Sequence, residues 1–148
     1  MSRALTVVRI SKIVEVVLGE LGLTLNQYRM LTFIERGAPP IAELGSRLAM
    51  KPPNVTTLID GLVERGFALR AKNPDDGRRV DLSITGEGEA LLREAETRND
   101  AVLDYLAGRS KNSDALLGGL DSWADVLDDV AIGLLREALR GAEEPDSA

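Results

Sequence analysis

The feature that most constrains this chain is a change of hydrophobic period near residue 66. Residues 52–65 carry apolar side chains at intervals of three and four, which predicts an amphipathic helix that ends at Gly66. Residues 67–72 and 80–84 then read as strands, and the second alternates apolar with polar side chains. Between the two lies Asn-Pro-Asp-Asp-Gly at 73–77, which is rich in turn formers. The sequence therefore predicts a β-hairpin directly after a helix.

A shorter helix is expected just before this one. Residues 41–48 repeat apolar side chains with helical spacing, and residues 49–51 form a turn before Pro52 and Pro53, which a first helical turn tolerates. Short helix, tight turn, second helix and hairpin together make a winged helix-turn-helix. The second helix of such a unit enters the major groove of DNA, and the hairpin extends sideways toward the minor groove. We therefore expect residues 40–85 to read duplex DNA.

Longer helices are expected on both sides of this unit. Helical spacing and capping residues predict helices over 3–21, 24–36, 86–107 and 114–140. The last carries a heptad-like apolar stripe, formed by Leu116, Leu120, Trp123, Leu127, Val130 and Leu134. One copy lacks the elements to cover the apolar faces of the first and last helices. We therefore expect a homodimer whose recognition helices lie about one DNA turn, roughly 34–36 Å, apart.

The expected fold is mainly α, with a small β-hairpin as its wing. Residues 24–85 are predicted to form the DNA-binding domain, and residues 1–23 with 86–140 a helical dimerisation domain. Residues 141–148 lack apolar anchors, so a disordered tail is expected there.

Composition narrows the possible functions further. The chain contains no cysteine and no histidine, which excludes disulfides, thiolate metal sites and histidine-based catalysis. No apolar run approaches the roughly 18 residues that span a bilayer, so a cytoplasmic protein without a membrane partner is expected. Neither a cofactor nor a metal is expected. An enzyme, for instance a carboxylate-dependent hydrolase, stays the weaker alternative because no nucleophile elbow or phosphate loop supports it.

The net charge of −6 is unevenly distributed. Residues 24–85 hold nine Lys or Arg and seven Asp or Glu, a net of +2, whereas the other residues hold nine and seventeen, a net of −8. Phosphates respond mainly to the nearest charges, because salt screens distant ones. An acidic chain with a mildly basic centre is therefore compatible with DNA binding.

Residues 25–92 resemble the MarR family (multiple antibiotic resistance regulators) in the order and spacing of several motifs. These motifs are Ile41 to Leu44, Val55, Leu58 to Leu62, Glu64 to Phe67, Arg70, Asp76 to Arg79, and Leu82 to Gly88. The resemblance implies a dimeric DNA-binding regulator, a repressor rather than an activator. Because the family often responds to small aromatic or phenolic anions, such an effector is expected as well. Tyr28 and Arg29, near the junction of the two expected domains, are the candidates for binding it.

The resemblance also assigns roles to individual side chains in the hairpin. Arg78 would be the wing-tip arginine that enters the minor groove, and Asp76 would brace it through a carboxylate–guanidinium pair. Arg79 and Lys72 would contact phosphates or the groove wall. The alternative for this turn is a solvated, salt-bridged loop with no role in binding.

The recognition helix departs from many relatives in its charge. Residues at family DNA-contact positions are Lys51, Pro53, Asn54, Thr56 and Thr57. Many relatives have an arginine at the position of Thr57 and a basic residue at that of Gly61. Base reading here would rest on Asn54 with adenine and on threonine methyl groups with thymine, although Asn54 could instead serve a local backbone bond. A dimeric interaction protein that has lost DNA binding is therefore a second alternative.

Overall fold

The computed structural model describes residues 2–37, 40–74 and 80–128. Its elements are α1 (Arg3–Glu20), α2 (Leu25–Glu35), α3 (Ile41–Leu48), α4 (Pro52–Glu64), β1 (Ala68–Lys72), β2 (Val80–Ile84), α5 (Gly86–Ala107) and α6 (Ser113–Asp128). The predicted mainly helical fold with one hairpin is confirmed, and the described ends of the elements agree with the prediction to within one residue. Positions 129–140 of the last predicted helix, and the predicted tail 141–148, lie outside the described residues.

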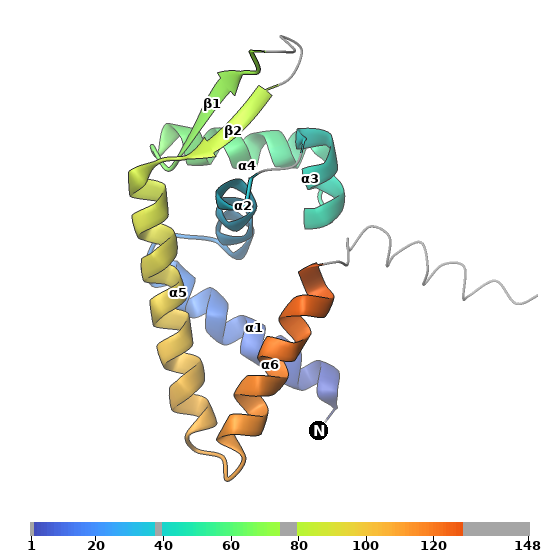
Figure 1. Cartoon of the computed structure of the whole chain (residues 1–148), viewed down its shortest axis with the longest axis vertical. Coiled ribbons are helices and arrows are strands. Elements are labelled where there is room, and N and C mark those ends of the chain that lie inside the picture. The colour runs from blue at the N-terminus through green and yellow to red at the C-terminus, as the bar shows by residue number, and fades with distance from the viewer. Residues whose placement is uncertain (1, 38–39, 75–79, 129–148) are drawn as a thin grey trace, which may run out of the picture.

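Two ends of the molecule are apparent in Figure 1. At the top, α4 crosses above α2, α3 lies beside it, and the hairpin projects beyond both. The helix α5 runs from the hairpin down the length of the molecule, and α6 turns back from its far end. The helix α1 crosses the lower half and contacts both α5 and α2.

Side-chain caps fix where two of these helices begin. Thr24 accepts from the Gln27 backbone N–H, and the Gln27 side chain accepts from the Thr24 N–H, which completes a capping box. Thr85 accepts from the Gly88 N–H at 3.0 Å and donates to the Gly66 carbonyl at 2.7 Å. Because Thr85 caps α5 and also bonds to the turn before β1, it ties the root of the hairpin to the start of α5.

The hydrophobic core lies mainly under α2, α3, α4 and the root of the hairpin. Its buried members are Leu18, Leu23, Met30, Leu31, Ile34, Leu44, Leu48, Val55, Ile59, Leu62, Ala68, Leu92 and Ala95. Met30, Leu31 and Ile34 form the buried side of α2. The aromatic rings of Tyr28 and Phe33 are only partly buried at the edge of this core.

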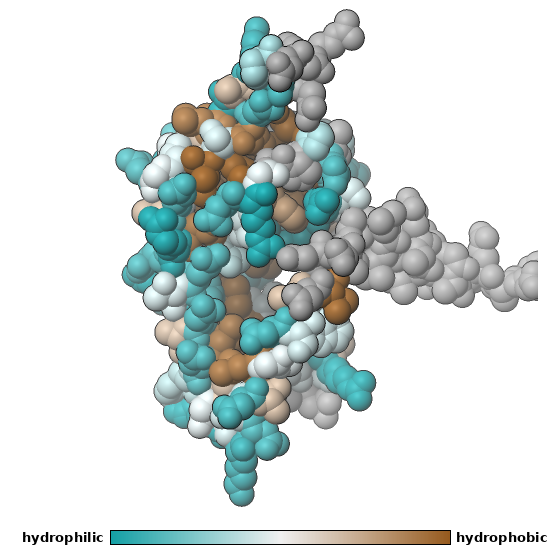
Figure 2. Space-filling view, in the orientation of Figure 1, coloured by the Kyte–Doolittle hydropathy of each residue, from teal (hydrophilic) through white to brown (hydrophobic). Residues whose placement is uncertain are grey.

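Unlike the side chains of the core, many apolar side chains of α1 and α6 are exposed. Of the α1 residues, Leu18 alone is buried, and many large apolar side chains in the lower half of the molecule are exposed. They are Leu5, Val7, Val8, Val16, Tyr105, Leu106, Leu116, Leu120, Trp123, Val126 and Leu127. Figure 2 shows apolar surface in this lower half, between α5 and α6. Within the described residues, no helix combines the length and the apolar character needed to cross a bilayer.

Candidate nucleic-acid interface

The predicted DNA-contact residues of α4 share its outer face. Lys51, Pro53, Asn54, Thr56 and Thr57 are all exposed. On the opposite face, Val55, Ile59 and Leu62 are completely buried in the core, where α4 packs against α2, α3 and β1. Amphipathic spacing thus turns this polar side outward, and the hairpin lies next to α4 (Figure 1). The structure brings these five residues together, and their contact with DNA stays a prediction.

Hydrogen bonds within α4 limit what its first turns can offer a ligand. The Thr56 hydroxyl donates to the Pro52 carbonyl at 3.3 Å, and the Thr57 hydroxyl donates to the Pro53 carbonyl at 3.1 Å. Each hydroxyl therefore keeps an acceptor oxygen and a methyl group for contact, while its hydrogen is already used. Such a surface favours thymine methyl groups and base amino groups over phosphates.

The N-terminus of α4 is also poorly equipped to bind phosphate through its backbone. Pro52 and Pro53 have no N–H, and the next N–H, that of Asn54, donates to the Lys51 carbonyl at 3.0 Å. Lys51 makes no side-chain cap, so its ammonium group is the cation that this helix end presents. Any phosphate contact here would therefore rest on the lysine side chain rather than on free N–H groups.

The hairpin stands on a defined register next to α4. Ala68 pairs with Ile84, and Lys72 pairs with Val80. Lys72 is exposed at the outer end of β1, as its predicted role requires. The positions assigned to wing-tip contacts, Asp76, Arg78 and Arg79, lie outside the described residues, and their roles stay predictions.

An ion pair between α4 and β1 was missed by sequence reasoning. Arg70 Nη1 lies 2.5 Å from Asp60 Oδ1, and the two side chains are 33% and 55% exposed. Both residues belong to the motifs that resemble the MarR family, but neither was assigned a role. The available signal was strand alternation, because Arg70 is two residues from buried Ala68 and so lies on the same face of the hairpin.

The two candidates for effector binding point in different directions. The Arg29 guanidinium donates to the Arg47 carbonyl at 3.0 Å, at the C-terminal end of α3. Partial burial of Arg29 lowers the pKa of its guanidinium. Tyr28 faces α5, where burial and the nearby carboxylates of Glu96 and Asp100 raise the pKa of its phenol. The structure does not bring Tyr28 and Arg29 onto one lining, and ligand binding by either stays a prediction.

Across the described ranges, no group of three or more Asp or Glu side chains is arranged to hold a metal ion. What the described surface offers is a polar helix face with a hairpin at its side, which is a binding arrangement.

Comparison with known proteins agrees with this geometry. A model of the MarR family matches residues 21–79. The HTH-type transcriptional regulator YhbI of Bacillus subtilis is 38% identical over 85 residues, 57% of this chain and 55% of YhbI. The HTH-type transcriptional regulator FarR of Neisseria gonorrhoeae is 31% identical over 100 residues, 64% of this chain and 68% of FarR. The chain thus spans little more than half the length of YhbI and two thirds of FarR.

Solved structures match over more of the chain. A MarR family regulator from Rhodococcus sp. RHA1 shares the fold with a TM-score of 0.69 at 20% identity, covering 84% of this chain and 88% of that one. The transcriptional repressor CouR, bound to a 23-mer DNA duplex, has a TM-score of 0.63 at 29% identity, and the match covers 80% of this chain and 87% of CouR. Sequence motifs, fold and relatives agree, and the chain belongs to the MarR family.

Proposed function

We propose that this chain is a transcription regulator that binds duplex DNA as a homodimer and represses its target genes. The observation that carries the proposal is the exposed polar face of α4 with the hairpin beside it. The DNA-bound CouR structure supports DNA as the ligand. Repression is supported by the repressor MdtR of Bacillus subtilis, 30% identical over 83 residues, and by the homoprotocatechuate degradative operon repressor of Escherichia coli, 30% identical over 77.

A second copy of the chain is the proposed cover for the exposed apolar surface. The described part of α6 exposes a stripe that includes Leu116, Leu120 and Trp123, and α1 exposes Val7 and Val8. Contiguous apolar surface of this kind marks an interaction site in most folded proteins. A two-fold dimer would bury equivalent faces of both copies and would present two α4 helices to a pseudo-palindromic operator.

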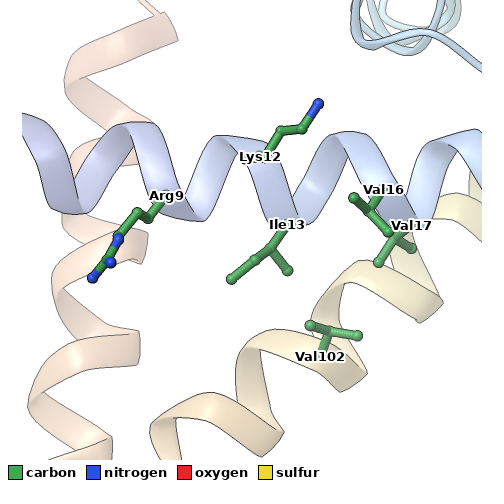
Figure 3. Close-up of a pocket in the computed structure, with 6 residues that line it drawn as sticks. All are labelled: Arg9, Lys12, Ile13, Val16, Val17 and Val102. Atoms are coloured by element: carbon green, nitrogen blue, oxygen red, sulfur yellow. The ribbon is translucent and has the colours of Figure 1, made fainter.

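An apolar cavity between α1 and α5 supports the proposal of a small aromatic or phenolic effector. The cavity has a volume of about 530 Å³, and Ile13 and Val17 of α1 face Val102 of α5 across it (Figure 3). Arg9 extends on the same side as Ile13 and adds a cation to the lining. Lys12 is a second cation in the lining, and apolar walls with a few charged groups suit an aromatic anion. Benzoate should raise the melting temperature of the protein and weaken its DNA binding, and a Val102→Trp variant that fills the cavity should show neither effect.

The proposed activity is binding rather than catalysis. A regulator of transcription acts where the chromosome lies, so the cytoplasm is the proposed location. A dimeric interaction protein without DNA binding is the alternative that the weakly charged α4 leaves open, and the DNA-binding experiment below decides between the two.

Fluorescence anisotropy with the duplex from upstream of the gene tests the proposal. Affinity should fall steeply between about 50 and 200 mM salt, because bound phosphates release counterions. Arg78→Ala should weaken binding. If Arg78 neutralises a phosphate, the substitution should also lower the salt slope, which is the slope of the logarithm of affinity against the logarithm of salt concentration, by about one. Lys111, exposed between α5 and α6, provides the matched control, and Lys111→Ala should leave affinity unchanged. A folded dimer that fails to bind at about 50 mM salt would contradict the proposal.

A further inference from the structure

Asp60 is a carboxylate on the surface that is proposed to face DNA. It follows Thr56 by four residues and Thr57 by three, so all three side chains lie on one face of α4, and all three are exposed. A negative charge at this position would repel phosphates if nothing compensated it. The compensating charge comes from the hairpin, where Arg70 Nη1 lies 2.5 Å from Asp60 Oδ1.

The fold leaves Arg70 well placed to reach α4. Gly66, with a φ of +77°, ends α4 and turns the chain into β1. Ala68 is then fully buried, and Arg70 lies on the same face of the strand two residues later. Opposite Arg70 in the register is Leu82, a half-buried residue of β2 that packs against the core. The pair therefore lies where the hairpin leaves the core and begins to project.

We propose that Arg70 is a positioning residue that fixes the hairpin relative to α4 and cancels the charge of Asp60. This inference rests on the proposed DNA-binding function. Exposed ion pairs contribute little to folding stability. This pair, however, joins two elements that must contact one duplex at the same time, so loosening it lowers the fraction of molecules with both elements in place.

The test uses Arg70→Met, Asp60→Asn and the double variant in the full-length dimer, with anisotropy measured at several salt concentrations. Arg70→Met should weaken DNA binding at least about tenfold, because it loosens the hairpin and exposes the Asp60 charge. In the Asp60→Asn background the same substitution should lower DNA affinity no more than about threefold, because the two residues then no longer interact. Equal losses in the two backgrounds would overturn the inference.

The salt slope separates positioning from direct contact. The double variant replaces a neutral ion pair by two neutral side chains, so its slope should equal that of the wild type while its affinity stays lower. A slope reduced by about 0.9 would mean that Arg70 itself neutralises a phosphate, and positioning would be wrong. Arg93, exposed on α5 near Glu89, is the matched control, and Arg93→Met should change neither slope nor affinity.

Two outcomes keep the inference distinct from the function on which it rests. If the wild type fails to bind DNA, the proposed function is wrong. If the wild type binds and Arg70→Met binds equally well, the function stands and the positioning role is wrong. Thermal melting of each variant shows whether the fold survives, and the expected melting temperatures lie close to that of the wild type.

Discussion

The upper and lower halves of this molecule handle their apolar side chains in opposite ways. In the upper half, Ile59 of α4 and Leu31 of α2 are completely buried by elements of the same chain. In the lower half, Trp123 of α6 keeps 64% of its surface exposed, and its neighbours in the stripe are exposed too. The upper half thus builds its core within one copy, whereas the lower half leaves apolar surface exposed, which the proposed dimer would cover. Substitutions should therefore act on folding above and on assembly below.

The largest expected effect is on the root of the hairpin. A Cβ at Gly88 would lie 2.1 Å from the Phe67 carbonyl oxygen and 2.8 Å from Ile84 Cγ1. The Phe67 carbonyl accepts the Thr85 N–H at 3.1 Å, so it cannot move without breaking the link between β1 and α5. Gly88→Ala should therefore lower the free energy of unfolding by about 3 kcal/mol, as measured by urea denaturation.

Gly86 supplies the matched control for that substitution. It lies two residues earlier in the same helix, is exposed, and a Cβ there meets nothing within 4 Å. Gly86→Ala should be neutral or stabilise the protein by up to about 1 kcal/mol, because alanine favours the helix. Both variants must be compared at one protein concentration, since the stability of a dimer depends on it. Equal losses from the two substitutions would contradict the packing argument.

The second prediction concerns assembly in the lower half. Trp123→Glu places a charge in the exposed stripe of α6, and a two-fold interface meets each substitution twice. If burying an aromatic side chain contributes about 1.5 kcal/mol per copy, the dissociation constant of the dimer should rise at least about 100-fold. Sedimentation velocity at micromolar concentration measures this change.

Gly118 provides the control on the same helix. Helical spacing puts Gly118 on the face opposite Trp123, and its Cβ would meet nothing within 4 Å. Gly118→Glu should leave the dimer intact. A Trp123→Glu variant that sediments as a stable dimer would mean that α6 does not form the interface.

The sequence predicts the elements better than it predicts the contacts between them. Local signals suffice for α4 and the hairpin, since spacing, the Pro52-Pro53 start and Gly66 act within a few residues. The partner of Arg70 depends on how β1 returns over α4, which no local pattern specifies. The sequence also does not predict where the side chains of Tyr28 and Arg29 point, because adjacent residues of a helix face different neighbours. The wing-tip roles rest on the resemblance alone.

A third prediction tests how tightly the upper half is packed around the turn between α3 and α4. Ala49 has a φ of +55°, a left-handed conformation that costs a residue with a Cβ about 1 kcal/mol. It is held there because the Met50 N–H bonds to the Gly45 carbonyl at 2.8 Å and Met50 packs on the core. Ala49→Gly should raise the free energy of unfolding by about 0.5–1 kcal/mol. Ala101→Gly, on the exposed face of α5, should lower it by a similar amount, and a loss at both positions would contradict strain at Ala49.

The smallest expected effect lies where the two halves meet, at the contact of α2 with α5. Partial burial and the carboxylates of Glu35 and Asp100 raise the pKa of Glu96, and Arg36 opposes the shift only in part. Since the folded protein disfavours the ionised form, this carboxylate destabilises the fold as the pH rises above the ordinary pKa that the group has in the unfolded chain. The full cost is reached once the pH exceeds the raised pKa of the folded state.

Glu96→Gln should therefore stabilise the protein at pH 7 and lose most of its advantage at pH 4, where this carboxyl group of the wild type is protonated in most molecules of both states. The gain should be about 0.5 kcal/mol, the size of a like-charge pair four residues apart on a helix, such as Glu96 with Asp100. Salt should reduce the part of the gain that comes from charge repulsion and leave the part that comes from burial. Urea denaturation at the two pH values measures this gain in stability. Asp104→Asn, at an exposed site on α5, is the control and should not change the stability. An advantage that persists unchanged at pH 4 would mean that the glutamine acts through packing between the two halves rather than through charge.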